Sequence, residues 1–242
     1  SGIGIVSQVC SCSVIYWWRP RQGIKSELWN VEAAVGVRIQ AIDGYERGRG
    51  TTWFLRHDDH ALVLRPFYRG GFMSRFNRDR YIFSSLDNTR AFKEFAILER
   101  LYKAGLPVPE PAGARVVKTG KGYTADLITR RIPKAQDLLQ ILQLPASNEL
   151  LRSIAETIAK LHKFGVLHPD LNIQNILVDQ SGKVWVIDFD QAKITSLKKR
   201  HRYRMIERLE RSFIKEHVRH GIIWTEKNWA FFRECYKHAY SH

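Results

Sequence analysis

The sequence predicts an α+β fold in two parts, a small β-rich N-terminal part and a mainly helical C-terminal part. Short runs of β-branched and aromatic residues bounded by turn residues predict strands in the first part, over 31–40, 51–56, 113–118 and 123–130. Beyond residue 131, a helical stretch is expected from Asp137 to Leu144. A longer helix is expected after the cap residue Ser147, because apolar residues recur at helical spacing as far as Leu161. The expected domains are an unassigned segment 1–26, an N-terminal lobe 27–130 and a C-terminal lobe 131–242.

The most informative motif is His168-Pro169-Asp170-Leu171-Asn172-Ile173-Gln174-Asn175, and Asp188 follows thirteen residues after Asn175. This order matches the kinase catalytic loop H-x-D-x-x-x-x-N, in which the Asp accepts the proton of an attacking hydroxyl. The Asn and a second Asp hold Mg2+ against the nucleotide phosphates. The pattern therefore predicts a phosphotransferase site with Asp170 as the catalytic base and Asn175 and Asp188 as metal ligands.

A hairpin explains how Asp188 returns to Asn175. The apolar runs 176–178 and 184–187 flank Asp179-Gln180-Ser181-Gly182-Lys183, which has the composition of a turn. A single H-x-D is weak evidence, because a buried histidine or a capping aspartate accounts for it equally well. The loop, hairpin and Asp188-Phe189-Asp190 together favour the catalytic interpretation. Asp190 is either a second metal contact or a cap that orients the loop.

The N-terminal part offers candidate nucleotide-binding residues. Gly48 and Gly50 lie between two predicted strands, which fits either a phosphate-covering loop or a plain hairpin turn. Arg65 ends the strand-like run 61–65, where a protein kinase carries a lysine, and the arginines at 69, 75, 78 and 80 are alternatives to it. Thr89 is the expected cap of a helix whose predicted apolar face consists of Phe95, Leu98 and Leu101. The helix carries Glu94, the candidate partner of that cation, with Glu99 as the competing choice.

Composition limits the protein class. The chain has 242 residues, 44% hydrophobic and 12% aromatic, and contains no apolar run near the roughly 20 residues that a membrane-spanning helix needs. The cysteines, Cys10, Cys12 and Cys235, lack the spacing of a metal or redox site and are expected to be reduced. Residues 1–16 lack the basic start and long apolar core of a signal peptide, and this segment is expected to lie at the periphery of the fold.

A net charge of +15 predicts a polyanionic partner. Lysines and arginines are concentrated between Lys198 and Arg219, interleaved with apolar residues at helical spacing. Such a helix fits docking on an anionic membrane surface. A solvated helix face whose basic side chains extend around an ordinary core contact accounts for the same pattern.

Several segments together resemble the lipopolysaccharide kinase family, in particular its 3-deoxy-D-manno-octulosonic acid (Kdo) kinases. The resemblance rests on Gly48-Arg49-Gly50, Leu62-Val63-Leu64-Arg65, Arg69-Gly70-Gly71, Arg90-Ala91-Phe92-Lys93-Glu94-Phe95, Leu106-Pro107-Val108-Pro109, Asp170-Leu171-Asn172-x-x-Asn175-Ile176-Leu177 and Ile187-Asp188-Phe189-Asp190. It covers most of residues 45–220 and implies a two-lobed protein-kinase-like fold.

The resemblance also implies a function. It implies ATP-dependent, Mg2+-dependent phosphorylation of the 4-hydroxyl of Kdo on Kdo-lipid A by a peripheral protein at the cytoplasmic face of the inner membrane. Only 52 residues follow Asp190, without an A-P-E type segment, which favours a substrate other than a protein. The alternatives are a heptose kinase, another small-molecule kinase or, more remotely, a basic nucleic-acid-binding module. A nucleic-acid partner is not expected, because the basic stretch lacks regularly spaced aromatic residues for base stacking.

Overall fold

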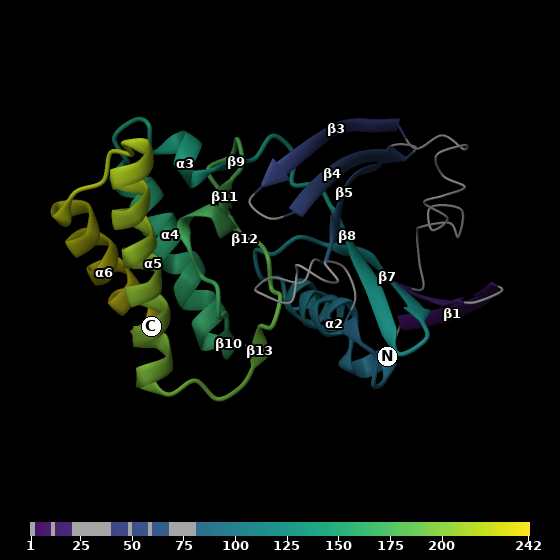
Figure 1. Cartoon of the computed structure of the whole chain (residues 1–242). Helices are drawn as coiled ribbons and strands as arrows, with labels where there is room; N and C mark the ends of the chain where they lie inside the picture. The colour runs from purple at the N-terminus through teal and green to yellow at the C-terminus, as the bar shows by residue number, and fades with distance from the viewer. Residues whose placement is uncertain (1–2, 11–12, 21–39, 48–49, 58–59, 68–80) are drawn as a thin grey trace. The chain divides into compact units, whose positions relative to one another are not determined.

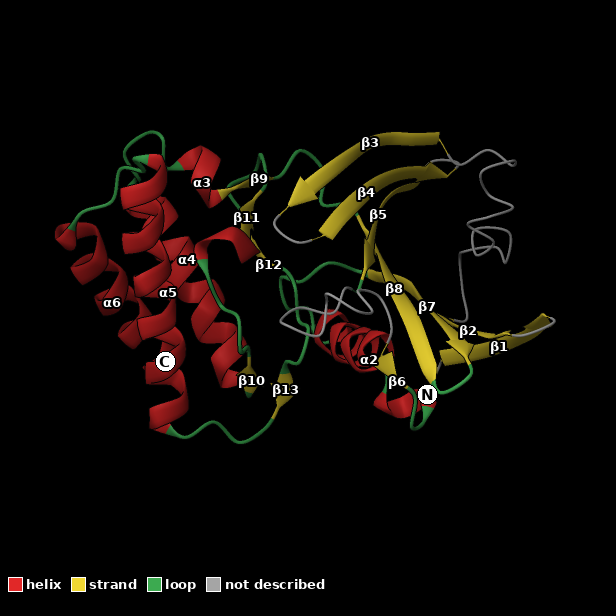
Figure 2. Cartoon of the chain, viewed as in Figure 1, coloured by secondary structure: helices red, strands yellow, loops and turns green. Residues whose placement is uncertain are grey.

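A computed structural model describes residues 3–10, 13–20, 40–47, 50–57, 60–67 and 81–242 of the chain. Two compact units are present: a first unit of Ser1–Glu99 with Glu110–Arg131, and a second unit of Arg100–Pro109 with Ile132–His242. The first unit carries the main sheet, and the second carries most of the helices (Figures 1 and 2). The α+β class predicted from the sequence is confirmed.

An antiparallel sheet is the framework of the first unit. Its strands follow the order β1-β2-β7-β8-β5-β4-β3, and β6 pairs with β8. The strands are β1 Ile3–Cys10, β2 Ser13–Pro20, β3 Gln40–Arg47, β4 Gly50–His57, β5 His60–Pro66, β6 Tyr81–Ile82, β7 Pro111–Thr119 and β8 Gly122–Arg130. The strands predicted over 51–56, 61–65, 113–118 and 123–130 are confirmed. The strand predicted over 31–40 falls almost wholly outside the described residues.

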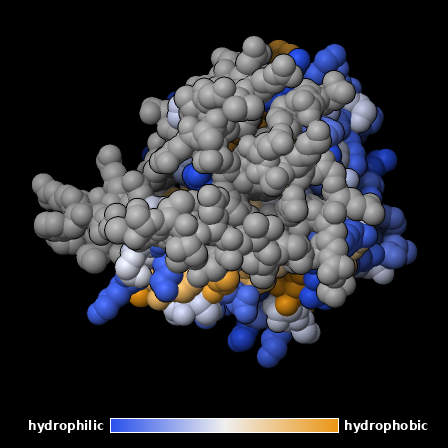
Figure 3. Space-filling model, turned by 90° about the vertical axis from the view of Figure 1, so that its right-hand side faces the viewer, coloured by the Kyte–Doolittle hydropathy of each residue, from blue (hydrophilic) through white to orange (hydrophobic). Residues whose placement is uncertain are grey.

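The central strands β5 and β8 bury apolar side chains at alternate positions. Leu62 and Leu64 of β5 are buried, as are Ala125 and Leu127 of β8. Side chains two residues apart share one face of a strand, and the register pairs Leu64 with Ile128 and Arg65 with Leu127. Leu62 and Leu64 therefore lie on one face of the sheet, and Ala125 and Leu127 lie on the other. Other apolar residues stay at the surface: Ile82 is 77% exposed, and Figure 3 shows apolar atoms (orange) among hydrophilic ones (blue) on one face of the molecule.

Helix α2 (Arg90–Lys103) lies against this sheet, because the Arg90 N–H donates to the Tyr123 hydroxyl at 3.2 Å. The helix begins directly after Thr89, as predicted. Thr89 acts mainly through its main chain, since its carbonyl accepts the Lys93 N–H at 3.1 Å while its hydroxyl donates to Leu86 O at 2.7 Å. The predicted apolar face of the helix is buried and consists of Phe95, Leu98 and Leu101.

Residues 3–10 and 13–20 form β1 and β2 at one edge of the main sheet, whereas residues 1–16 were expected only to lie at the periphery of the fold. Strands β1 and β2 form a hairpin, and β2 extends the sheet by pairing with β7 from Ser13 with Thr119 to Trp18 with Ala114. Valine, isoleucine, tyrosine and tryptophan, which favour strands, fill residues 14–18. The pairing partner lies about a hundred residues away in sequence, and local composition alone does not identify it.

The division between the units after Arg131 lies one residue from the expected boundary, but one earlier segment departs from the expected division. Arg100–Pro109 belongs to the second unit, although the residues on either side belong to the first. Two contacts hold this segment there. Val186 N–H donates to Pro107 O at 3.0 Å, and the Arg100 guanidinium lies 5.8 Å from the centre of the Phe164 ring.

The second unit combines helices with short strand pairs. Its helices are α3 Leu138–Ile141, α4 Asn148–Lys163, α5 Lys199–His220 and α6 Glu226–Ser241. Its strands are β9 Gln136–Asp137, β10 Val166–Leu167, β11 Ile176–Val178, β12 Val184–Val186 and β13 Lys193–Ile194. Strand β11 lies between β12 and β9, and β10 pairs with β13. Across the described residues, no helix is both long and apolar enough to cross a membrane.

Helix α4 forms as the sequence predicts. The Ser147 hydroxyl caps it by accepting the Leu150 N–H at 3.2 Å. The predicted core face is buried, with Leu151, Ile154, Ile158 and Leu161 each at most 3% exposed. The preceding helical stretch is shorter than predicted: Asp137 caps α3, but that helix ends at Ile141 rather than Leu144.

Helices α5 and α6 complete the helical layer beside α4 (Figure 1). α5 buries Met205, Leu209 and Phe213 at helical spacing. α6 contributes aromatic rings, and the ring of Trp229 is centred 6.0 Å from that of Phe213 on α5. These contacts fix the position of α5, which lies along the loop that carries Asp170.

Candidate active site

The predicted catalytic loop connects β10 to β11 and is organised by Asn172. Its side-chain oxygen caps the short 3-10 turn Ile173–Asn175 by accepting the N–H groups of Gln174 at 2.8 Å and Asn175 at 3.2 Å. Its side-chain nitrogen donates to Asp170 O at 3.0 Å. One asparagine therefore satisfies main-chain groups on both sides of itself and sets the shape of the loop.

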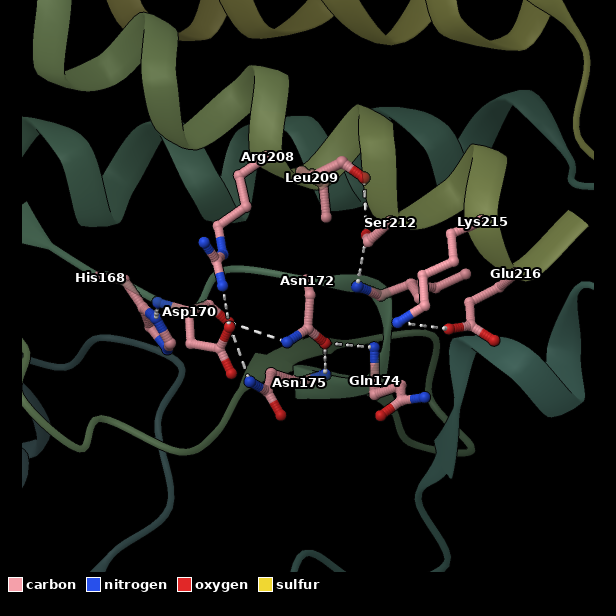
Figure 4. Close-up of polar contacts among 11 residues, drawn as sticks. His168, Asp170, Asn172, Gln174, Asn175, Arg208, Leu209, Ser212, Lys215 and Glu216 are labelled. Carbon is pink, nitrogen blue, oxygen red and sulfur yellow. Dashed lines mark hydrogen bonds and ion pairs between the residues drawn. The ribbon is translucent and has the colours of Figure 1, made fainter. Parts of the chain in front are cut away.

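Asn175 is held against Asp170 by a second hydrogen bond. Its side-chain nitrogen donates to Asp170 O at 2.9 Å, and the residue is only 8% exposed. Because the nitrogen makes this bond, the side-chain oxygen faces the other way. Figure 4 shows that this oxygen and a carboxylate oxygen of Asp170 both point away from α5. The loop thus presents two oxygen atoms from residues five positions apart to the same side.

His168 holds the loop through hydrogen bonds of both ring nitrogens. It is 2% exposed, and burial lowers the pKa of its imidazole, which favours the neutral ring. Its Nδ1 accepts the Asp170 N–H at 3.2 Å, so the proton lies on Nε2, which donates to Ile187 O at 3.2 Å. The ring packs 5.0 Å from that of Phe189. A neutral, doubly bonded and buried imidazole acts as a support for the loop.

The hairpin brings Asp188 to this loop. Strands β11 and β12 pair from Ile176 with Val186 to Val178 with Val184, as the sequence predicts. The next residue, Ile187, donates its N–H to Asn175 O at 2.9 Å. Asp188 follows directly in the left-handed region, with φ of 63°. Aspartate tolerates this conformation better than most residues, and such backbone angles concentrate at functional sites.

The oxygen donors fit a hard divalent cation. Asn175 supplies an amide oxygen and Asp188 a carboxylate, and Mg2+ typically takes one or two protein oxygens with phosphate oxygens and water. In the described part of the chain, no three His, Cys, Asp or Glu side chains gather as a metal-binding group. The structure leaves the two interpretations of half-buried Asp190 open.

In the first unit, Arg65 of β5 forms an ion pair with Glu94 of α2 through Nη2 and Oε2. The Glu94 side chain is 2% exposed and that of Arg65 is 28% exposed. The Arg65 guanidinium also lies 4.8 Å from the centre of the Phe67 ring. Between the two glutamates considered from the sequence, Glu94 is the one that meets Arg65.

Of the two glycines predicted to contact the nucleotide, the structure describes Gly50. Gly50 is the first residue of β4 and pairs with Arg47 at the end of β3. Gly48 lies outside the described residues, as do the arginines at 69, 75, 78 and 80. The structure thus brings together Asp170, Asn175 and Asp188 in one unit and Arg65 with Glu94 in the other. The glycine loop remains a sequence-based hypothesis.

Arg208 is a site residue that the sequence interpretation missed. Its Nη2 lies 2.6 Å from Oδ1 of Asp170. One helical turn further along α5, the Ser212 hydroxyl accepts the Ile173 N–H at 3.0 Å. The sequence grouped Arg208 with the other basic residues of this stretch. Its distinguishing signal is its position beside the buried Met205 and Leu209, at the edge of the apolar face.

A known protein family and several named proteins are similar in sequence to most of this chain. The family described as "Lipopolysaccharide kinase (Kdo/WaaP) family" matches residues 38–236. A protein of Vibrio parahaemolyticus named 3-deoxy-D-manno-octulosonic acid kinase is 44% identical over 198 residues, covering 80% of this chain and 82% of that protein. A protein of the same name from Actinobacillus succinogenes is 41% identical over 233 residues, covering 91% and 94% of the two chains.

A further relative of that name, from Vibrio cholerae, is 40% identical over 220 residues and covers 90% of each chain. The family match spans most of this sequence, including the loop of Asp170, the hairpin and the Arg65–Glu94 pair. The chain belongs to the lipopolysaccharide kinase (Kdo/WaaP) family.

Proposed function

We propose that this protein is an ATP-dependent phosphotransferase that phosphorylates the 4-hydroxyl of Kdo on Kdo-lipid A. The observation that carries the proposal is the fixed arrangement of Asp170 and Asn175, with Asp188 delivered beside them by the hairpin. The name shared by relatives that cover most of this chain supports Kdo as the acceptor. A protein-kinase-like arrangement, with a nucleotide-binding lobe over 27–130 and a catalytic lobe over 131–242, belongs to the same proposal.

Asp170 is the base in this mechanism. Its carboxylate hydrogen-bonds the 4-hydroxyl and accepts its proton while the sugar oxygen forms a bond to the γ-phosphorus. The bond from that phosphorus to the β,γ-bridging oxygen breaks, and ADP leaves. His168 holds the main chain of Asp170 without exchanging a proton, since its Nδ1 already accepts the Asp170 N–H.

Asn175 and Asp188 hold Mg2+ in this proposal. When bound by these two residues, the ion would supply positive charge that offsets the charge of the nucleotide phosphates. Asn175 contributes its side-chain oxygen, whose direction is set by the hydrogen bond to Asp170 O. Asp188 would contribute its carboxylate from a left-handed backbone conformation, two residues after the end of β12.

Nucleotide phosphates are the proposed ligands of Arg65, which Glu94 orients through the ion pair within the first unit. A guanidinium binds phosphate oxygens in a planar, two-pronged manner, unlike the lysine found at this place in protein kinases. Main-chain groups at Gly48 and Gly50 complete the proposed phosphate contacts. This part of the proposal rests on the ion pair and on the order of motifs in the sequence.

The protein is also proposed to act as a peripheral protein at the cytoplasmic face of the inner membrane. Ile214 and Val218 of α5 are 60% and 79% exposed, and the exposed cations Arg211 and Lys215 lie beside them on the helix. An apolar strip flanked by lysine and arginine suits an anionic bilayer surface. Each such cation contributes on the order of 1 kcal/mol near that surface.

Not every cation of the stretch from Lys198 to Arg219 is available for docking. The Arg202 guanidinium packs 3.7 Å from the centre of the Tyr240 ring, and Arg208 pairs with Asp170. Docking is therefore assigned to exposed residues, with Lys198, Lys199 and Arg200 near the start of α5 and Ile214 and Val218 near its end.

Vesicle sedimentation tests this surface. Neutralising Lys198, Lys199 and Arg200 together is expected to weaken binding to anionic vesicles, and binding of the unchanged protein is expected to fall steeply with salt. Activity on a water-soluble Kdo glycoside, measured on the same preparation, separates lost docking from lost folding. Vesicle affinity that is unchanged by the substitutions would show that the basic face is only solvated.

Mass spectrometry of Kdo-lipid A after incubation with the protein, ATP and Mg2+ tests the activity directly. The expected product gains one phosphate, and fragmentation places it on the 4-hydroxyl of Kdo. Incubation with heptose-containing acceptors distinguishes a heptose kinase. Phosphate appearing only on heptose, or on neither sugar, would refute the proposal.

A further inference from the structure

The guanidinium of Arg208 lies beside the proposed base in the folded protein. Arg208 Nη2 lies 2.6 Å from Asp170 Oδ1, and Figure 4 shows the arginine reaching from α5 toward the loop. The two side chains are 47% and 51% exposed, so solvent reaches both. An ion pair this exposed contributes only about 0–1 kcal/mol to stability. Stability therefore does not explain why a cation is placed here.

Contacts on both sides of Arg208 fix its place over the loop. Before it, the Met205 sulfur accepts the His168 N–H at 3.3 Å. After it, Ser212 accepts the Ile173 N–H at 3.0 Å. These residues lie three and four positions from Arg208, on the same side of the helix. The helix therefore holds the main chain of Arg208 over the loop, within reach of Asp170.

We propose that Arg208 binds the carboxylate of the acceptor sugar and thereby selects an acidic sugar over a neutral one. This inference rests on the proposed function, in which Asp170 receives the proton of the Kdo 4-hydroxyl. In Kdo only C2 and C3 separate the acid carbon from C4, so a sugar with its 4-hydroxyl at Asp170 carries its carboxylate close by. A planar guanidinium has five N–H donors, enough to hold Asp170 and a second carboxylate together.

Such a bridge orients the acceptor as well as selecting it. With the sugar carboxylate on Arg208 and the hydroxyl on Asp170, two points of the same ring are held relative to the base. An acceptor lacking the carboxylate would leave the exposed guanidinium without that interaction. The preference for an acidic over a neutral sugar then depends on Arg208 of α5, which lies outside the kinase motifs of the loop and hairpin.

The test compares two soluble acceptors, a Kdo glycoside and its carboxamide, which keeps the shape and removes the charge. The unchanged protein is expected to prefer the acid by about 10- to 100-fold in kcat/KM, the range of one hydrogen bond to a charged group. Arg208→Gln is expected to reduce this preference to within about twofold, mainly through a higher KM for the acid. Arg208→Lys keeps the charge and is expected to retain part of the preference.

Arg233→Ala is the matched control. Arg233 also pairs with a carboxylate at 2.6 Å, that of Glu210 on α5, and its side chain is 42% exposed. This variant loses a comparable ion pair on the same helix and is expected to keep the full preference for the acid. Circular dichroism and melting temperature confirm that each variant is folded before its kinetics are compared.

Two results would overturn the inference. If Arg208→Gln loses activity equally toward both acceptors, the arginine only positions Asp170. If the unchanged protein phosphorylates the Kdo glycoside and its carboxamide equally well, no group of this protein recognises the carboxylate. Absence of phosphorylation of either acceptor, together with unmodified Kdo-lipid A, would instead refute the proposed function on which the inference depends.

Discussion

The side-chain amide of Asn175 donates a hydrogen bond to the main-chain oxygen of Asp170 at 2.9 Å. This contact joins the proposed metal ligand to the proposed base within one short loop. Asn172 bonds the same oxygen at 3.0 Å, so two asparagines converge on one main-chain atom. The positions of the two functional groups are therefore coupled, which explains why the motif requires a fixed spacing between them.

Asp188→Asn is expected to lower kcat by about 10²-fold or more, because the variant loses the carboxylate that would hold the metal. Asparagine tolerates the φ of 63° at this position, so the melting temperature should change little. Turnover is measured across a Mg2+ titration. Wild-type activity at limiting Mg2+ in a folded variant would remove Asp188 from the metal site.

Asp190→Ala, measured in the same series, distinguishes the two interpretations of Asp190. A second metal contact predicts a higher Mg2+ requirement with unchanged melting temperature. A loop cap predicts a lower melting temperature with unchanged Mg2+ dependence.

Arg65→Ala is expected to destabilise the protein by about 3 kcal/mol, because it removes the cation that faces the buried Glu94 carboxylate. The double variant Arg65→Ala with Glu94→Gln should recover part of that loss, since the buried charge is then absent. Denaturant unfolding of both single variants and the double variant gives the coupling free energy between Arg65 and Glu94. Strictly additive losses would mean that the ion pair has no role in stability.

Gly165→Ala is expected to cost at least about 2 kcal/mol, because φ is 90° and the added Cβ would lie 2.5 Å from Thr195 O. Gly182→Ala is the matched control: φ is 80° and no atom lies within 4 Å of the added Cβ. Urea unfolding compares the two variants. Since Gly165 immediately precedes β10 and the catalytic loop, its variant should also lose activity. Equal stability losses in the two variants would show that the contact with Thr195 is relieved at little cost.

His162 predicts a pH-dependent loss of stability. Burial, followed by the charges of Arg202 and His168, lowers its pKa from 6.5 to about 3. Above pH 6.5 neither the folded nor the unfolded state binds this proton, so the group contributes nothing there. As the pH falls from 6.5 toward 3, only the unfolded state binds it, and the unfolding free energy falls by up to about 1.4 kcal/mol per pH unit.

Urea unfolding between pH 5.5 and 7 checks this slope. His162→Gln keeps a polar group near the Tyr236 hydroxyl, which lies 2.7 Å from Nδ1 of His162, and should flatten the slope. Part of the slope should persist, because burial also lowers the pKa of His168. An identical slope in the variant would show that His162 takes up its proton in the folded state.

Local patterns predicted the elements whose signals are local. The Ser147 cap, the apolar face of α4 and the turn at 179–183 follow from spacing and turn composition within a few residues. Glu94 could be proposed because its helix and the strand of Arg65 have separate local signals. Confirming that they meet required the tertiary structure, in which these residues pair across 29 positions of sequence.

The failures share a different cause. Pairing of β2 with β7 and the grouping of Arg100–Pro109 with the second unit depend on contacts distant in sequence. Arg208 has the same basic character as its neighbours on α5, and only the packing of α5 on the loop distinguishes it. Charge in a sequence identifies a basic helix but not which of its cations meets a carboxylate.

Asp170→Ala tests the central claim most directly, because the loop is held by main-chain atoms of Asp170. His168 bonds its N–H, and Asn172 and Asn175 bond its carbonyl oxygen. Among the described residues, the side chain pairs with Arg208 and is half exposed, so its removal should barely change the melting temperature.

The decisive measurement is kcat for Kdo phosphorylation by folded Asp170→Ala, with melting temperature and ATP-analogue affinity determined on the same preparation. The account predicts a fall of about 10²–10⁴-fold in kcat with little change in the other two quantities. Near-normal kcat per folded molecule, particularly with a lowered melting temperature, would contradict it and leave Asp170 as a structural residue of the loop.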